Sequence, residues 1–180
     1  FPIYARETYR LMELRYRQDP SKSRLAFSSA IGHMAVVAMH NKDFEDAIAR
    51  YQEMVKTRRA ISDEDPRDMN AKVRYATAID RLGNTYALAG KAPEAIQSGE
   101  LALQLLRKLH QEDPGNTSTA KEYLFAAGDL SKAYDLAKRL DRACPVAREF
   151  LASYNKSAKG TQVGLDRHLT RNTELLKKCP

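Results

Sequence analysis

The sequence repeats itself at a fixed interval of 48 residues, and this period constrains the fold more than any other feature. Ala47, Ala95 and Ala143 follow one another at that spacing. The same offset, carried without gaps, aligns further small and apolar residues: Ala30, Ala78 and Ala126; Met34, Leu82 and Leu130; Ala35, Gly83 and Ser131; Ile48, Ile96 and Cys144. Self-similarity at a period of this length is the signature of an array of stacked helical units.

The middle of the chain indicates what one unit contains. Ile79, Leu82 and Tyr86 fall on one face of a helix, since they are spaced by three and four residues. Gly83 lies on the same face, where a missing side chain lets another helix come close. Gly90 is expected to end this helix in the left-handed conformation, which costs glycine nothing. The unit is therefore predicted to be a hairpin of two helices.

Three such hairpins are predicted between residues 21 and 158. Asn41 is expected to end the first helix in the left-handed conformation, and Asp43 to cap the second. The stretch Ser62–Arg67 is acidic and contains a proline, so it is predicted to be a junction between hairpins. The expected helices are residues 22–41, 43–60, 68–89, 92–111, 118–138 and 141–157.

Each end of the chain is predicted to add one helix. Residues 1–18 read as an amphipathic helix followed by Asp19-Pro20, and we interpret residues 1–20 as the second helix of a truncated repeat. Tyr4, Tyr9 and Tyr16 on it are expected to contact the next helix pair, with a recognition surface as the alternative. Residues 159–180 are predicted to cap the array with one helix over 163–178. Its apolar stripe is expected at Val163, Leu169 and Leu176, with Leu165 or Thr173.

The spacing of several residues in the middle hairpin resembles the signature of the tetratricopeptide repeat (TPR). These residues are Ile79, Leu82, Gly83, Tyr86, Gly90 and Ala95. The resemblance covers about residues 23–158 and implies an all-α, right-handed superhelical solenoid of antiparallel helix hairpins. The usual unit has about 34 residues, so both helices of each hairpin must be longer here.

The long unit carries a second resemblance. With the junction Asp113-Pro114-Gly115-Asn116, it is similar to repeat arrays attached to bacterial serine/threonine protein kinases and related signalling proteins. The chain begins at Phe1, and its first helix lacks a hairpin partner, so we expect a fragment of a larger bacterial signalling protein. The resemblance implies a non-catalytic scaffold here, while leaving room for a kinase elsewhere in the parent protein.

The resemblance also implies where a partner binds, because first helices line the concave face of such arrays. A mixture of apolar, amide and charged groups at those positions suits an extended peptide or a partner helix. Gly32 and Val36 stand where chaperone-binding members carry a lysine and an asparagine, so that subclass is excluded. The expected groove residues are Ser29, His33, Val36, His40, Thr77, Asp80, Arg81, Asn84, Leu88, Phe125, Asp129 and Lys132, with Gly32, Gly128 and Leu136 at matching positions.

The composition permits two other functions, which are nucleic-acid binding and homodimerisation. The net charge of +7 permits nucleic acid as a partner. However, the 30 basic residues are interleaved with 23 acidic ones, which is typical of a solvated helical surface. A homodimerisation module is the other alternative. We find no catalytic motif, no clustered metal ligands, no phosphate-binding loop and no apolar run that could span a membrane, so we expect no enzyme activity, cofactor, metal or membrane contact in this fragment.

The two cysteines, Cys144 and Cys179, leave a choice. Cys144 could be a small buried thiol, since it is in register with Ile48 and Ile96. Alternatively, a last helix that returns antiparallel would bring Cys179 close enough to Cys144 for a disulfide. That bond would indicate an extracytoplasmic, oxidising compartment, and its absence a cytoplasmic one.

Overall fold

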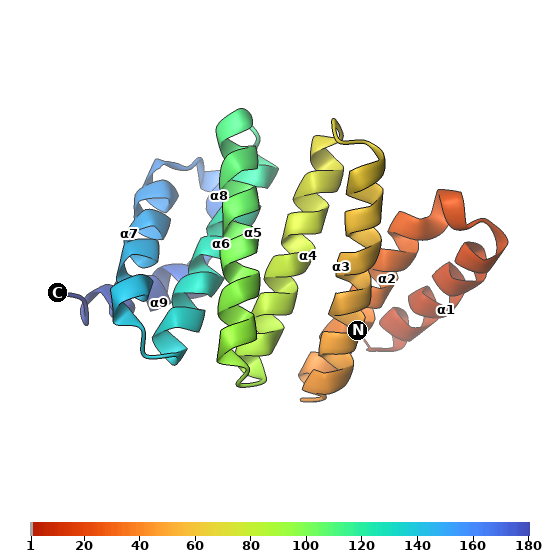
Figure 1. The fold of residues 1–180 in the computed structure, drawn as a ribbon, viewed down its shortest axis with the longest axis horizontal. Helices are drawn as coiled ribbons and strands as arrows, with labels where there is room; N and C mark the ends of the chain where they lie inside the picture. Colours follow the sequence, from red (N-terminus) through yellow and green to blue (C-terminus); the bar gives the residue numbers. More distant parts are fainter. Residues whose placement is uncertain (1) are drawn as a thin grey trace. The chain divides into compact units, whose positions relative to one another are not determined.

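The computed structural model describes residues 2–180 of the chain, and in this range it contains nine helices and no strand (Figure 1). The chain divides into two compact parts, an N-terminal part that ends at Ala78 and a C-terminal part, Ile79–Pro180. The helices are α1 (Pro2–Gln18), α2 (Pro20–His40), α3 (Phe44–Glu64), α4 (Met69–Leu88), α5 (Ala92–Glu112), α6 (Thr117–Leu136), α7 (Leu140–Lys156), α8 (Lys159–Gln162) and α9 (Asp166–Leu176). The fold is the predicted helical repeat solenoid, and its two parts are described in turn.

In the N-terminal part, α1 packs against α2, which packs against α3. The rings of Tyr9 and Tyr16 lie 5.5 and 4.8 Å from that of Phe27 in α2. The contact predicted for these two tyrosines is thus confirmed, whereas Tyr4 is 79% exposed and makes no such packing contact. Phe1, the first residue of the predicted helix, lies outside the described residues.

The crossing of α2 and α3 depends on small residues. Ala35 and Ala47 are both fully buried. A Cβ atom on Gly32 would lie only 2.8 Å from the Sδ atom of Met54 in α3. Gly32 therefore faces its own second helix, and the prediction that it faces the groove is wrong.

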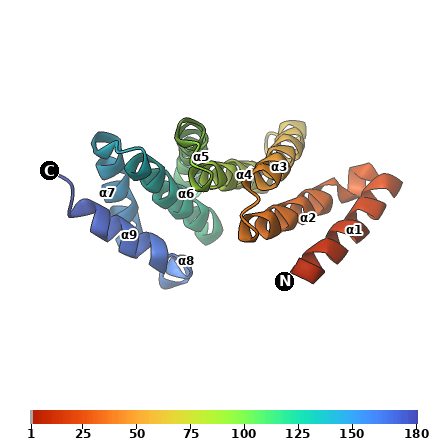
Figure 2. The same cartoon turned by 90° about the horizontal axis from the view of Figure 1, so that it is seen from below.

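In the C-terminal part, neighbouring helices run antiparallel, with α6 packed against both α5 and α7 (Figures 1 and 2). Gly83 in α4 faces α5 as predicted: a Cβ atom there would lie 3.1 Å from Ser98 Cβ and 3.3 Å from the amide nitrogen of Gly99. Ala95 and Ala143, one period apart, are both buried. Small residues at these positions let the helix axes approach closely.

The turn inside each hairpin repeats with the sequence period. Lys42, Gly90 and Lys138 are 48 residues apart and all have positive φ, at 62°, 77° and 57°. The prediction for Gly90 is confirmed, but the left-handed residue of the first hairpin is Lys42, because Asn41 has φ −81°. In each turn the next amide donates a 2.9 Å hydrogen bond to the carbonyl five residues before it: Asp43 to Ala38, Lys91 to Tyr86, and Arg139 to Tyr134.

Asp-Pro marks the junctions between hairpins, as the sequence predicts. Asp65 and Asp113 end α3 and α5. The side chains of Asp68 and Asn116 then accept hydrogen bonds from amides in the first turns of α4 and α6. The first junction is shorter than expected, because α3 continues as far as Glu64.

The C-terminal segment differs from the single helix that the sequence predicts. Gly164, with φ 83°, separates the one-turn α8 from α9. Val163 is consequently 66% exposed, and the buried apolar residues of this segment are Leu165 and Leu175. Figure 2 shows α9 lying beside α7 and α6, against which it packs. It begins one residue away from the position that lies 48 residues after the start of α6, so it continues the period as another first helix.

Cys144 near the start of α7 and Cys179 after α9 lie at disulfide-bonding distance, with their Cα atoms 5.9 Å apart. The antiparallel return of the last helix brings about this approach. Within residues 2–180, no helix combines the length and the apolar character that crossing a membrane requires.

Candidate functional site

The C-terminal part contains a groove of about 450 Å³ between side chains of α4, α6 and α9. It is lined by Asp80, Arg81, Asn84, Leu88, Glu122, Phe125, Asp129, Lys132, Arg167, His168 and Arg171. Seven residues predicted from the sequence line this groove: Asp80, Arg81, Asn84, Leu88, Phe125, Asp129 and Lys132. We refer to it below as the α4/α6/α9 groove.

The other predicted residues lie elsewhere. Thr77 is 7% exposed, and its hydroxyl donates to the Val73 carbonyl at 2.9 Å. This hydroxyl is therefore already hydrogen-bonded within its own helix. Ser29 accepts a hydrogen bond from Arg58. His33 and His40 are exposed on α2 and Val36 is half-buried; their role in a groove stays a prediction. Two α6 residues at matching positions also fall outside the lining: Leu136, which is 57% exposed, and Gly128.

A side-chain hydrogen bond between Lys132 and Asn84 connects α6 to α4 in the groove. The Lys132 ammonium donates to Oδ1 of Asn84 at 3.1 Å. Burial lowers the pKa of Lys132, and the nearby Arg171 acts in the same direction while Asp129 opposes it. The ammonium is thus partly desolvated, so it interacts more strongly with groups in the groove than a surface lysine would.

The third wall of the groove comes from α9. His168 Nε2 lies 3.1 Å from Oδ1 of Asp129, and its ring meets the Phe125 ring edge-on at 5.1 Å. A Cβ atom on Gly128 would lie 2.4 Å from the His168 ring, so the glycine makes room for the histidine. Arg171 adds a weaker ion pair with Asp129 at 3.9 Å.

Sequence reasoning missed four lining residues, and for three of them a signal was present. Arg167, His168 and Arg171 belong to α9, which continuation of the 48-residue period would have identified as a further first helix. Glu122 lies one turn before Phe125 on α6, outside the positions that the TPR resemblance marks.

Asp80 is the most deeply buried charged residue of the groove, at 6% exposed. Its Oδ1 atom is enclosed and has no hydrogen-bond partner among residues 2–180. Burial, together with the negative charges of Asp129 and Glu122, raises the pKa of Asp80 well above its ordinary value, and only Arg81 opposes this. A buried carboxyl without a partner is costly, and such groups concentrate at functional sites.

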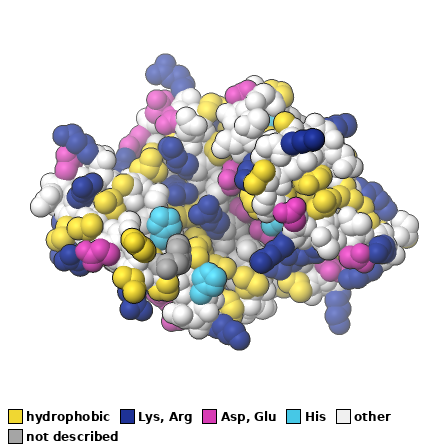
Figure 3. Space-filling model, turned by 180° about the vertical axis from the view of Figure 1, so that it is seen from behind, with side chains coloured by type: hydrophobic (Ala, Val, Ile, Leu, Met, Phe, Trp, Pro, Cys, Tyr) yellow, Lys and Arg dark blue, Asp and Glu magenta, His cyan; other side chains and the backbone are white. Residues whose placement is uncertain are grey.

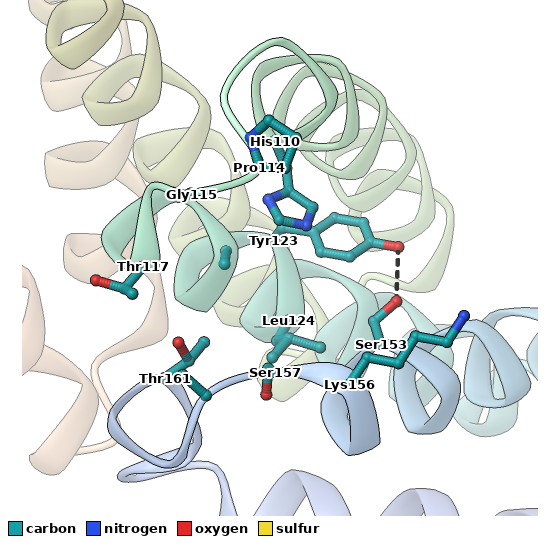
Figure 4. A pocket seen from close by; sticks show the side chains of 12 residues that line it. His110, Pro114, Gly115, Thr117, Tyr123, Leu124, Ser153, Lys156, Ser157 and Thr161 are labelled. Carbon is teal, nitrogen blue, oxygen red and sulfur yellow. Dashed lines mark hydrogen bonds between the residues drawn. The ribbon is translucent and has the colours of Figure 1, made fainter.

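A second cavity, of about 410 Å³, lies where α5, α6, α7 and α8 meet (Figure 4). His110 stacks on Tyr123, whose hydroxyl donates to Glu149 at 2.6 Å and lies 3.4 Å from the Ser153 hydroxyl. The Tyr123 hydroxyl is therefore already satisfied. None of the predicted groove residues lines this cavity, so the α4/α6/α9 groove is the stronger candidate.

The surface charges do not gather into a basic stripe on the face drawn in Figure 3, where Lys and Arg side chains are interspersed with Asp and Glu. A continuous basic patch is the electrostatic footprint of a nucleic-acid-binding protein. Within the described residues, no group of three or more His, Cys, Asp or Glu side chains is placed to hold a metal ion.

Comparisons with known proteins support the helical-repeat fold. Residues 76–114 match the family model of the tetratricopeptide repeat. The crystal structure of BtubC (BKLC) from P. vanneervenii resembles the fold with a TM-score of 0.62 and 16% sequence identity, over 99% of this chain and 73% of that chain. At this identity the likeness concerns the fold alone. No curated protein matches the sequence.

Proposed function

We propose that this chain is a non-catalytic protein-interaction module that binds an extended peptide or a partner helix in the α4/α6/α9 groove. The observation that carries the proposal is the convergence of seven predicted groove residues, from two repeats, on one groove. The match of residues 76–114 to the tetratricopeptide repeat and the helical-repeat fold support a scaffold role.

Contacts within the groove fix its shape before a partner arrives. Lys132 is bonded to Asn84, and His168 to Asp129, so α6 is connected to both flanking helices. Leu88 offers an exposed apolar surface at the rim, being 44% exposed. A site whose side chains are already ordered loses less conformational entropy on binding, which favours affinity.

The identity of the longer protein to which this chain belongs is a separate prediction. A bacterial signalling protein with a kinase domain remains our prediction, based on the long unit and the Asp113–Asn116 junction. Sequencing the complete gene tests it directly: a kinase catalytic domain in the same reading frame would support the prediction, and its absence would contradict it.

Site-specific photo-crosslinking tests the groove proposal. We would place p-benzoylphenylalanine at Leu88 in the groove and, as a matched control, at Leu101 on α5, which is 42% exposed and lines neither cavity. We expect a protein partner from lysate to crosslink at Leu88 only. The crosslink should disappear when Asn84→Ala and Lys132→Ala are added.

Other outcomes would contradict the proposal. Equal crosslinking at both positions would mean that the groove has no special role. Crosslinking to a second copy of this chain would favour homodimerisation, and recovery of nucleic acid in a salt-sensitive complex would favour the electrostatic alternative.

A further inference from the structure

Asp80 is the groove's acidic side chain with a buried, unpartnered oxygen, as far as residues 2–180 show. Its Oδ1 atom has no hydrogen-bond partner among residues 2–180. Asp129, by contrast, faces both His168 and Arg171. Burying a carboxyl without a partner is unfavourable, so a group supplied from outside would relieve a cost that the folded chain already bears.

The charges around Asp80 indicate the chemistry of that group. Negative charge from Asp129 and Glu122 acts on Asp80, while Arg81 is the one cation that acts on it appreciably. Arg81 is exposed, and Lys132 is committed to Asn84. The groove is also lined by Arg167 and Arg171, but neither is among the charges that act appreciably on Asp80. Close to Asp80, an incoming cation would therefore be attracted by carboxyl groups, and an incoming anion would be repelled by them.

We propose that the α4/α6/α9 groove receives a lysine or arginine side chain of its partner, and that Asp80 is the residue that binds it. The inference rests on the proposed function and specifies the partner as a peptide segment with a cationic side chain. Leu88 and Phe125 line the same groove and can cover the aliphatic stem of that side chain. Arginine would add two parallel hydrogen bonds to the carboxylate.

Synthetic decapeptide libraries test the inference without a known partner. Each library has one fixed central residue, arginine, citrulline or glutamate, and random residues elsewhere. Citrulline has nearly the shape of arginine but no charge, so it isolates the ionic contribution. Peptides captured on the immobilised full chain are counted by mass spectrometry.

We expect the arginine library to be captured about tenfold more than the citrulline library. Asp80→Asn should abolish this preference while keeping the side-chain shape. The control Asp141→Asn removes an exposed carboxyl at the start of α7, which lines neither cavity, and should leave the preference intact. The arginine–citrulline comparison on the unaltered chain needs no variant to fold.

The opposing outcomes are distinct. Equal capture of the arginine and citrulline libraries, lost on Asn84→Ala with Lys132→Ala, would overturn the cation subsite and leave the groove function standing. Preferential capture of the glutamate library would overturn the subsite in favour of an acidic partner. No capture above that double variant by the unaltered chain would overturn both proposals.

Discussion

The ammonium of Lys132 donates a hydrogen bond to the side-chain oxygen of Asn84, 48 residues earlier in the sequence. The two residues occupy the same position in consecutive repeats. Equivalent positions on neighbouring first helices therefore meet, and this contact relates the sequence period directly to a contact in space. It also explains why the predicted groove residues of α4 and α6 line one groove.

Gly83→Leu is expected to lower the free energy of unfolding by about 1–3 kcal/mol or more, because even a Cβ atom at this position would crowd Ser98 and the backbone of α5. Urea unfolding followed by circular dichroism measures the change. Gly160→Leu is the control, since a Cβ atom there meets nothing within 4 Å. Equal stability of the two variants would contradict the close helix crossing.

The hairpin turns predict opposite effects at two equivalent positions. Gly90→Ala should cost about 1 kcal/mol, although a Cβ atom there has open space, because left-handed backbone is unfavourable for alanine. Lys138→Gly should stabilise the chain by about 0.5–1 kcal/mol for the same reason. The free energy of unfolding of each variant would be compared with that of Gly160→Ala, and a stabilising Gly90→Ala would contradict the turn assignment.

Asp80 predicts an unusual dependence of stability on pH. Its pKa is raised in the folded state, so the folded chain binds this proton more tightly than the unfolded chain does. Stability from this group is therefore fully present below about pH 4 and is lost as the pH rises through the folded-state pKa. Asp80→Asn should remove this loss, so thermal midpoints of variant minus wild type should increase from pH 4 to pH 8. A difference that stays constant or decreases over that range would contradict it.

The pair Cys144 and Cys179 predicts a covalent tie between α7 and the end of the chain. Replacing both by serine should lower the free energy of unfolding by about 2–4 kcal/mol, since the bond closes a loop with a sequence separation of 35 residues. Alkylation and intact-mass measurement, with and without reductant, detects the bond in protein secreted to an oxidising compartment. Two reactive thiols without reductant would contradict it and would favour the reduced alternative.

Most of the fold could be predicted because the period and the helix-ending residues act locally. The positions of Gly90, Asp113 and Asn116 are determined by backbone conformation and capping within a few residues. The errors arose where tertiary packing overrides such signals. Lys42 adopts the left-handed conformation beside an asparagine that seemed better suited, and α3 runs through an acidic stretch to Glu64.

The site was predictable to the extent that it depends on the repeat. Positions on α4 and α6 followed from the register of the TPR signature. The contribution of His168 was missed, because the last segment was interpreted as a polar cap, although continuing the 48-residue period indicates that α9 is a further first helix. The burial of Asp80 was also hidden, because its neighbours Asp129 and Glu122 lie a full repeat away in sequence.

The bond between Cys144 and Cys179 has a mechanical consequence. Tension applied at Pro180 would pass through Cys179 directly to the start of α7, since the two residues are joined there. The segment between them, including α9 and its wall of the groove, would carry none of that load. As long as the bond is formed, the α9 wall of the groove would not be pulled directly while the chain is under tension.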